Sequence, residues 1–248
     1  MKAHLLRSAA RSLLLPASLI LATPVRALAT AINIATTAEV CASATASSGG
    51  TTVSNSMCTS PPEITATAAN GLAVADASGT QFTSVSPSSF SGLLRTSAST
   101  LMGLTDDSAS AQGYSIFIVT FEVTVPHTYD LSGELNHFTE GFASSTPHIQ
   151  FTGGTVNDMQ STTGGIFETV PFHFSGTLLP GVYTLLARSQ DDAFADALEN
   201  AFSGTGQSGV GFELTLTEVA AVPEPSALAL FASGGITLLG MFGRRKKA

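Results

Sequence analysis

Several kinds of residue are scarce in this sequence of 248 residues, and each scarcity narrows the function. Tryptophan is absent and tyrosine occurs three times, which leaves few of the side chains that sugar-binding modules stack against their ligands. Cysteine occurs twice, and charged residues make up only 11% of the chain. The sequence holds no His-Glu-x-x-His zinc motif, no Gly-x-Ser-x-Gly nucleophile motif and no Gly-x-x-x-x-Gly-Lys phosphate loop. We therefore predict no catalytic residues.

Basic residues are nearly absent from the central part of the chain, residues 30–221. This part holds two arginines and no lysine against 17 Asp and Glu residues, which gives a formal net charge of −15. A surface of this charge repels phosphate groups, so nucleic acid and anionic lipid are poor partners. Cations and neutral or cationic polymers are compatible with it. The acidity also has a simpler explanation, because net charge keeps an exported protein soluble.

The first 29 residues have the three parts of a secretory signal peptide. Lys2, Arg7 and Arg11 precede an apolar stretch over residues 13–22. A small-x-small cleavage pattern follows and ends at Ala29. The sequence thus predicts a signal peptide helix over residues 1–29, cut after Ala29, and export across the inner membrane.

The chain closes with an uncharged run of 17 residues from Ser226 to Phe242, followed by four cations. A helix of this length spans about 25 Å, the lower limit for crossing a bilayer. Cations beside a span mark its cytoplasmic side, and the signal peptide places residues 30–221 on the other side. We therefore predict a single C-terminal transmembrane helix over Ser226 to Phe242. Its cytoplasmic basic anchor consists of Arg244, Arg245, Lys246 and Lys247.

Val222-Pro223-Glu224-Pro225, the apolar run and the basic end together resemble the PEP-CTERM sorting signal of Gram-negative bacteria. The resemblance covers residues 222–248. It implies that Pro223, Glu224 and Pro225 are recognised by exosortase, a membrane enzyme thought to cut near the motif. The two prolines fit this role because they keep the segment out of helix and strand, and so extended and accessible. The resemblance further implies a destination at the cell surface or in an exopolysaccharide matrix, after transient or permanent anchoring in the inner membrane.

Both cysteines, Cys41 and Cys58, lie in the exported part, where an oxidising compartment permits a disulfide. Closing such a loop would contribute about 3 kcal/mol by chain-entropy estimates. The segment between them offers few apolar residues that would order it otherwise. We expect a disulfide, with two free thiols as the alternative.

The predicted fold class is all-β, an antiparallel, jelly-roll-like β-sandwich with one or two short helices. Residues 30–112 form an Ala/Ser/Thr/Gly-rich N-terminal part with weak strand signals. Residues 113–221 form the part of the same domain in which strands are clear. One helix is expected within residues 86–107, where Phe90, Leu94 and Leu101 are among the apolar positions.

The clearest strand signal is the alternation of Phe117, Val119 and Phe121 with polar residues, which is typical of a half-buried strand. Pro171 predicts an edge strand or a bulge. In the segment 179–188 the alternating positions are Val182, Thr184 and Leu186. Strands are expected over residues 114–125, 129–135, 148–151, 165–174, 179–188 and 210–219.

A second pattern resembles PEP-CTERM proteins, many of which carry Ser-Gly-x-Leu, then Pro-Gly-x-Tyr-x-Leu, and a last strand that runs into the sorting motif. The matching residues are Gly176, Leu178, Pro180, Gly181, Tyr183 and Leu185. Proline followed by glycine is typical of a tight turn. The pattern therefore predicts a hairpin at Pro180-Gly181.

One acidic group, between two predicted strands, is a weak candidate for a Ca²⁺ site, because hard cations bind several carboxylate oxygens. It consists of Asp191, Asp192, Asp196 and Glu199. Its spacing differs from that of an EF-hand. The simpler interpretation places Asp192 and Asp196 on the solvated face of a short helix whose Phe194, Leu198 and Phe202 cover the sandwich.

Four histidines belong to the exported part, and none has the spacing of a metal site. They are His127, His137, His148 and His173. We expect them at the surface or at strand edges.

The observations favour an exported, non-enzymatic protein of the cell surface or exopolysaccharide matrix. Its expected partners are an exosortase-like processing enzyme, the inner membrane and an exopolysaccharide, and no cofactor is predicted beyond the Ca²⁺ candidate. Two alternatives stay open at this point. One is an extracellular hydrolase with two carboxylates across a cleft, and the other is a Ca²⁺-dependent carbohydrate-binding module.

Overall fold

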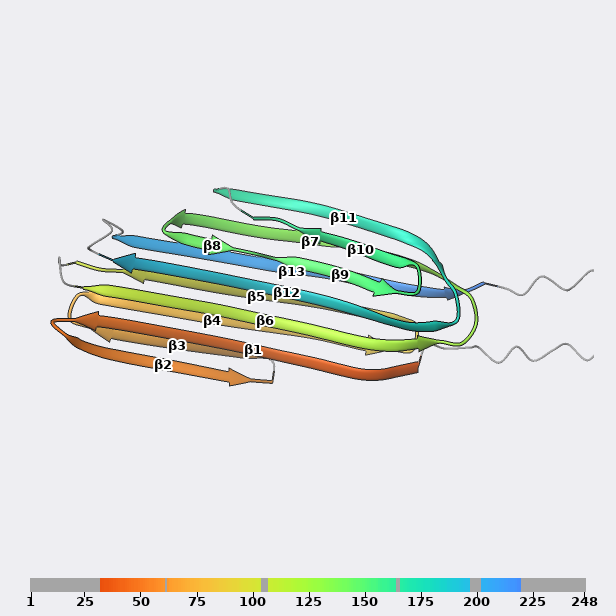
Figure 1. The fold of residues 1–248 in the computed structure, drawn as a ribbon, viewed down its shortest axis with the longest axis horizontal. Helices are drawn as coiled ribbons and strands as arrows, with labels where there is room; N and C mark the ends of the chain where they lie inside the picture. The colour runs from red at the N-terminus through yellow and green to blue at the C-terminus, as the bar shows by residue number, and fades with distance from the viewer. Residues whose placement is uncertain (1–31, 61, 104–106, 164–165, 197–201, 220–248) are drawn as a thin grey trace, which may run out of the picture.

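The structure, a computed structural model, describes residues 32–219 apart from 61, 104–106, 164–165 and 197–201. Every regular element in these ranges is a β-strand, and the strands form two antiparallel sheets packed face to face (Figure 1). The predicted all-β antiparallel sandwich is therefore confirmed. Several strands are much longer than the sequence indicated, and β1 alone has 17 residues.

The strands follow one another along the chain as β1 (Ile32–Ser48), β2 (Thr51–Thr59), β3 (Glu63–Asn70), β4 (Ala73–Ser86), β5 (Ser89–Leu101), β6 (Ser108–Val123), β7 (His127–Gly141), β8 (Ala143–Ser145), β9 (His148–Gly153), β10 (Val156–Ser161), β11 (Phe167–Leu178), β12 (Gly181–Asp196) and β13 (Ser203–Glu218). The seven-stranded sheet has the order β10-β9-β12-β6-β1-β2, and β8 pairs with β12. The six-stranded sheet has the order β11-β7-β13-β5-β4-β3. The strands run along the long axis of the body, and β1 begins at the same end at which β13 finishes (Figure 1).

The composition change near residue 112 is not a boundary in the fold. β1 pairs with β6, and β5 pairs with β13, so both parts of the chain contribute to both sheets. β11 is an edge strand of the six-stranded sheet, as the proline at position 171 predicts.

Two hydrophobic clusters fill the space between the sheets, one toward each end of the strands. The cluster nearer the start of β1 and the end of β13 is aromatic and aliphatic. In it the ring of Phe121 lies 4.8 Å from that of Phe90 and 6.1 Å from that of Phe151. Side chains of this size hold the sheets apart and contribute most of the buried apolar area.

The second cluster consists almost entirely of alanine. Along β1, for example, Ala42, Ala44 and Ala46 are buried and alternate with serine and threonine. Methyl groups allow the two sheets to approach closely. A Cβ added to Gly113 of β6 would lie 2.7 Å from the carbonyl oxygen of Ser78 on the opposite sheet. The sandwich is therefore thin at this end.

A buried polar layer separates the two clusters. On β5, Thr96 lies between Leu94 of the aromatic cluster and Ala98 of the alanine cluster. The other members of this layer are Gln81, Ser115, Ser189, Asp191 and Ser208, all 6% exposed or less. Because buried polar groups need hydrogen-bond partners, the layer fixes how the two sheets are positioned relative to each other.

Gln81 shows how this requirement is met. We orient its amide so that the nitrogen faces three acceptors, Ser115 Oγ at 3.2 Å, the carbonyl oxygen of Ile116 at 3.1 Å and that of Glu39 at 3.3 Å. Gln81, which lies on β4, thereby forms hydrogen bonds to β6 and β1 of the other sheet. The hydrogen-bond partners determine which end of a glutamine amide is the nitrogen and which is the oxygen.

The two predicted helices are wrong where the structure describes them. Residues 89–101 of the first are strand β5, in which Phe90, Leu94 and Ala98 face inward. In the second, β12 continues through Asp196, and residues 203–207 belong to β13. Phe194, expected to cover the sandwich, is 38% exposed on the outside of β12. Runs of Ala, Ser and Thr with period 2 override the local helix pattern, since the strand has neighbours to pair with.

Two further expectations for residues 178–188 are wrong. β11 and β12 belong to different sheets, so Pro180-Gly181 lies in a connection across the sandwich instead of a hairpin. Along β12 the buried residues are Tyr183, Leu185 and Ala187, and Val182 is 51% exposed. The predicted alternation was therefore offset by one residue.

The predicted signal peptide with its cleavage at Ala29, the sorting motif and the basic anchor lie outside the described residues. So does the transmembrane helix over Ser226 to Phe242. Within the described ranges, no helix is long and apolar enough to cross a membrane.

Candidate functional site

A groove of about 540 Å³ lies on the outer face of the six-stranded sheet, the sheet that lies behind the seven-stranded one in Figure 1. Side chains from β4, β5, β13, β7 and β11 line it. Strand register places them in two rows. One row is Thr80, Arg95, Gly209 and Asn136. The other row is Ser78, Ser97, Gln207, Phe138 and Phe167. We call this site the outer groove.

β13 contributes a glycine and no side chain at the centre of the outer groove, where Gly209 is buried beside the stem of Arg95. Gly209 belongs to the first row, and Gly211 follows two residues later on the same face. A Cβ on Gly209 would have as its nearest neighbour the carbonyl oxygen of Leu94 at 3.4 Å, and a Cβ on Gly211 would have the Glu134 Cγ at 3.8 Å. These are ordinary contact distances. Packing therefore does not require glycine at either position.

Arg95 is the cation of the groove. It is exposed, and it takes part in no ion pair within the part of the chain that the structure describes. Asn136, in the same row, is already engaged. It accepts from Thr169 Oγ1 at 2.6 Å and donates to Glu134 Oε1 at 3.2 Å. The groove thus combines a guanidinium available for an anion with polar side chains held in place by their neighbours.

Two phenylalanines form one end of the groove. Phe138 of β7 lies directly opposite Phe167 of β11, and Phe167 is 73% exposed. An aromatic ring this exposed on an edge strand presents a face to whatever lies in the groove. The outer groove therefore offers one positive charge, several hydroxyl and amide groups, and aromatic surface.

Behind the outer groove, the polar layer joins the sheets through Asp191. Its Oδ2 accepts from Thr96 Oγ1 at 2.6 Å, from the Ser208 backbone N–H at 2.9 Å and from Ser208 Oγ at 3.1 Å. The Ser189 hydroxyl lies 2.8 Å from Thr96 Oγ1 and 2.7 Å from Ser208 Oγ. Thr96 and Ser208 lie on β5 and β13, between the two rows of the groove. The carboxylate of β12 thus holds the groove's two central strands from inside.

The interior position changes the acidity of Asp191. It is fully buried, and burial raises its pKa to about 6, while hydrogen bonds from neighbouring hydroxyls limit the rise. Its Oδ1 has no hydrogen-bond partner. Asp191 is therefore protonated in weakly acidic solution, at a pH where an exposed aspartate is ionised, although no solvent reaches it in this conformation.

The structure does not bring the predicted Ca²⁺ ligands together. Asp191 points into the sandwich, whereas Asp192 points outward and accepts from Gln112 Nε2 at 2.6 Å. Asp196 is four residues farther along the same strand as Asp192, about 13 Å at the rise of a strand. Glu199 lies outside the described residues. The three described carboxylates therefore do not converge on one ion.

The histidines are likewise distributed over the fold. His137 is buried on β7 with its Nε2 3.9 Å from Glu168 Oε2, whereas His173 and Asp130 form an exposed pair at 3.0 Å. His127 Nδ1 lies 2.7 Å from the carbonyl oxygen of Val125. His148 belongs to the other sheet, where burial and the nearby Arg188 lower its pKa. Surface or strand-edge positions were expected, but two of the four are buried, His127 at the first residue of β7 and His137 within it.

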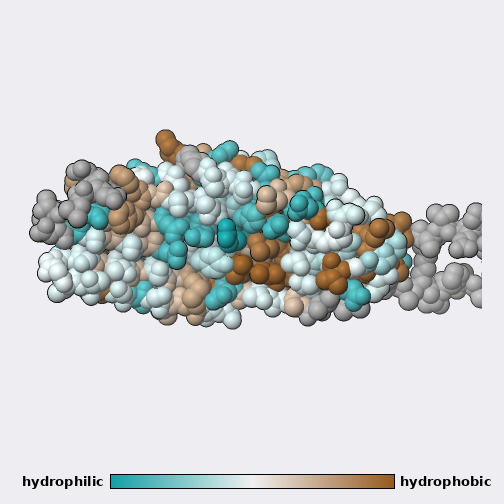
Figure 2. Space-filling model, in the orientation of Figure 1, coloured by the Kyte–Doolittle hydropathy of each residue, from teal (hydrophilic) through white to brown (hydrophobic). Residues whose placement is uncertain are grey.

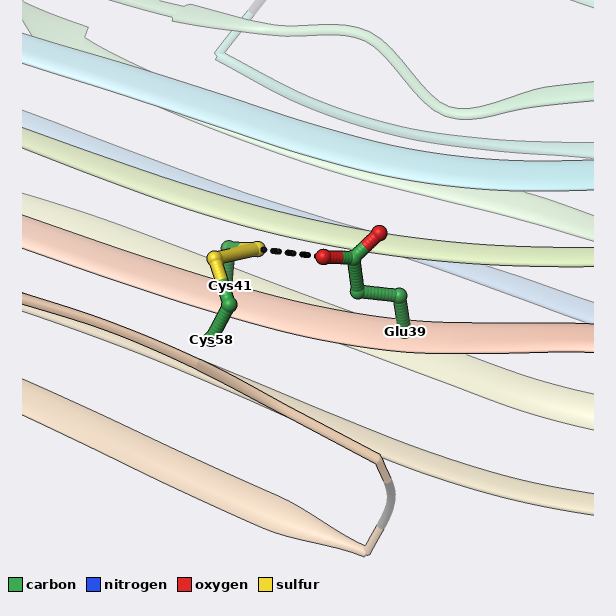
Figure 3. The surroundings of a disulfide bond; sticks show 3 residues. All are labelled: Glu39, Cys41 and Cys58. Atoms are coloured by element: carbon green, nitrogen blue, oxygen red, sulfur yellow. Dashed lines mark hydrogen bonds between the residues drawn. A yellow bond between two sulfur atoms is a disulfide. The ribbon is translucent and has the colours of Figure 1, made fainter.

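Cys41 and Cys58 form a disulfide between directly opposed residues of β1 and the edge strand β2 (Figure 3). Glu39 Oε1 lies 3.5 Å from Cys41 Sγ. Because a disulfide sulfur carries no hydrogen, this contact becomes a hydrogen bond only after reduction. The three residues are also the one group in the described part of the chain whose spacing would suit a metal ion, but the disulfide occupies both sulfurs.

The outer face of the seven-stranded sheet has a different character. Figure 2 shows polar side chains over its middle and apolar ones toward the end where β1 begins. Along β12 the outward-facing residues include Arg188 and Gln190 and, nearer the start of the strand, Leu186 and the exposed Val182. Burial and the nearby Glu39 raise the pKa of Tyr114 in this region, and Arg188 opposes the rise. Arg188 is the second of the two arginines in residues 30–221.

One glycine pattern needs its structural context. Gly204, Gly206 and Gly209 have the Gly-x-Gly-x-x-Gly spacing of dinucleotide-binding loops. Here the three lie within strand β13, not between a strand and a helix. The spacing therefore does not indicate a nucleotide site.

Sequence reasoning missed the outer groove altogether. Arg95 and Gly209 were separated by 114 positions, and only the pairing of β5 with β13 brings them together. The available signal was indirect. Arg95 is one of two cations in an acidic body, and Gly209 and Gly211 interrupt an otherwise strand-like sequence.

Residues 221–247 match the family model of the PEP-CTERM protein-sorting motif. The chain therefore carries a signal for export and for sorting by exosortase through a membrane-anchored C-terminal segment. No curated protein matches the chain. Among solved structures, the enzymatically active domain of tailspike protein 4 from bacteriophage CBA120 is similar over 57% of this chain at 11% identity, with a TM-score of 0.16. The similarity spans 19% of that chain, and at this TM-score it supports no conclusion about fold or function.

Proposed function

We propose that this chain, which carries the PEP-CTERM protein-sorting motif at residues 221–247, is a non-enzymatic protein of the cell surface or the exopolysaccharide matrix. The observation that carries the proposal is the sorting motif, which follows directly after the last strand of a single β-sandwich. Exosortase is the processing partner in this proposal, and exopolysaccharide is the surrounding material.

Two properties of the body support a place outside the cell, and a third supports a non-enzymatic role. A disulfide joins β1 to the exposed edge strand β2, and such bonds form and persist in oxidising compartments. The strongly acidic composition favours solubility. The hydroxyl and carboxylate groups of the polar layer are buried and bonded to one another, so their evident role is to join the sheets.

The proposal is tested on the full chain in its native cells, by cell fractionation and mass spectrometry of the recovered protein. We expect a surface or matrix protein that begins at Thr30 and lacks the residues after about Val222. A matched variant replaces Pro223, Glu224 and Pro225 with alanine. It should stay in the inner-membrane fraction with its C-terminal tail intact.

Two outcomes contradict the proposal. Surface-located protein that retains the sequence up to Ala248 would show that sorting does not involve cleavage. Hydrolysis of the cell's own polysaccharide by purified chain, at a rate that substitutions in the outer groove abolish, would show that the protein is an enzyme.

A further inference from the structure

We propose that the outer groove binds a short stretch of a polysaccharide strand that carries carboxylate groups, and that Arg95 binds one of these carboxylates. The inference deepens the proposed function, on which it rests for the source of the ligand. It concerns the face of the six-stranded sheet and does not involve the sorting motif.

The charge of the groove is the first argument. Residues 30–221 contain 17 acidic side chains, yet neither arginine forms an ion pair with the described residues. Arg95 lies in the outer groove, where its planar guanidinium can donate two parallel hydrogen bonds to a carboxylate. A single cation suits one carboxylate per site. The net charge of −15 disfavours a dense polyanion such as nucleic acid.

The glycine floor is the second argument. Gly209 and Gly211 have no left-handed backbone angle, and an added Cβ would meet neighbours only at 3.4 Å or more. Glycine is unfavourable within a strand when nothing requires it. Gly209 lines the groove without contributing a side chain, and Gly211 lies beside it on the same strand face. A ligand that approaches the sheet closely accounts for the glycine at position 209.

The remaining lining gives the third argument. Gln207, Ser97 and Thr80 offer neutral donors and acceptors of the kind that bind sugar hydroxyls. Phe138 and Phe167 offer ring faces for the apolar face of a sugar. This mixture distinguishes the site from a simple anion site, which would need neither the neutral groups nor the aromatic rings.

The length of the groove is the fourth argument. It extends from β4 to β11, across four strand spacings, or about 19 Å. That is enough for a few sugar rings in an extended chain. It is much more than an isolated carboxylate or phosphate would occupy.

The test uses the full chain, purified in a detergent without a sugar headgroup, and titration calorimetry at low salt. The probes are trigalacturonate, which has three carboxylates, the neutral trimer maltotriose, and inorganic phosphate. We expect trigalacturonate to bind more tightly than either of the others. The affinity should fall as salt is added, because one ion pair contributes to it.

Three variants localise the binding. Arg95→Met keeps the apolar stem and removes the charge, and it should weaken trigalacturonate binding by about tenfold to a hundredfold. Gly209→Leu fills the floor and should weaken it by a similar factor. Arg188→Met removes the other cation, on the opposite sheet, and should leave the affinity unchanged. Equal melting temperatures would show that all three variants are folded.

Several results would overturn the inference. Equal affinity for maltotriose would exclude a role for the carboxylate, and equal affinity for phosphate would exclude a saccharide site. An Arg188→Met effect as large as that of Arg95→Met would place binding elsewhere, and no binding of trigalacturonate would contradict the proposal outright. None of these results bears on where the protein is sorted, so the proposed function fails or stands by its own experiment.

Discussion

Asp191 accepts hydrogen bonds from both the backbone N–H and the hydroxyl of Ser208, and these two bonds join the two sheets. Asp191 belongs to β12 of the seven-stranded sheet, and Ser208 belongs to β13 of the six-stranded sheet. Gly209, the next residue, is the floor of the outer groove. A buried carboxylate on one sheet therefore positions the strand that carries the candidate site on the other.

The pKa of Asp191 predicts how stability varies with pH. An unfolded aspartate titrates near 4, and folded Asp191 titrates at about 6. Between these values the folded chain holds a proton that the unfolded chain has released. The free energy of unfolding should therefore fall as pH rises from about 4 to about 6, by on the order of 3 kcal/mol, and then level off. Urea denaturation at a series of pH values measures this.

Asp191→Asn should remove that part of the pH dependence, because asparagine does not titrate. Asp192→Asn, one residue away on the outer face, is the matched control and should retain the slope. If both variants follow the wild-type curve, the carboxylate of Asp191 is not the titrating group.

The alanine cluster should be sensitive to larger side chains. Ala98 is fully buried where the sheets approach closely. Ala98→Leu should therefore lower the free energy of unfolding by about 1–3 kcal/mol or more, through forced separation of the sheets. The side chain of the neighbouring Ser99 points outward, so Ser99→Leu should change the free energy of unfolding by less than about 0.5 kcal/mol. Chemical denaturation of the two variants compares them directly, and a neutral Ala98→Leu would mean that this end of the sandwich is loosely packed.

The disulfide should stabilise the edge of the seven-stranded sheet. Its removal in the double variant Cys41→Ser, Cys58→Ser should cost about 3 kcal/mol by the chain-entropy estimate for a loop of this length. Because β2 is exposed along its whole length, hydrogen exchange should rise first in residues 51–59. Adding a reductant to the wild type should give the same change, and adding it to the double variant should do nothing. A reductant effect on the double variant would point to a cause other than this bond.

Two glycines on adjacent, paired strands of the six-stranded sheet should differ in their tolerance of alanine. A Cβ on Gly133 would meet the backbone carbonyl oxygen of Gly211 and the ring of Phe172, so Gly133→Ala should destabilise the fold by about 1–3 kcal/mol or more. Gly209→Ala meets only ordinary contacts and should be neutral or slightly stabilising, since alanine loses less backbone entropy. Thermal unfolding of the two variants provides the measurement. Equal losses would show that Gly209 is required by the fold, which would remove one support of the groove proposal.

The sequence predicted the aromatic half of the sandwich better than the alanine half. The alternation around Phe117 and Phe121 has no helical counterpart, so strand was the only consistent interpretation. Ala42, Ala44 and Ala46 alternate just as regularly, but alanine is also the strongest helix former, and its small side chain gives a weak hydrophobic signal. A helix was expected where β5 runs for a different reason, because Phe90, Leu94 and Leu101 were interpreted as apolar positions of a helix.

The candidate site was less predictable than the fold, for a physical reason. Asp191 was noticed as an acidic residue, but its inward direction depends on how far β12 extends past Arg188. The outer groove depends on register between β4, β5, β13 and β7, whose residues are distant in sequence. Register follows from which faces are buried, and that is known only once the sheets are assembled.

The position of β13 has a mechanical consequence. It is the strand that leads to the sorting motif, and it is paired on both sides, with β5 over Ser203–Thr215 and with β7 over Gly204–Glu218. The strands run along the long axis of the body (Figure 1). Tension between an anchored C-terminus and a load held on the outer groove would therefore act along the strands. It would load both ladders in shear, so that many hydrogen bonds must break together before β13 slides out.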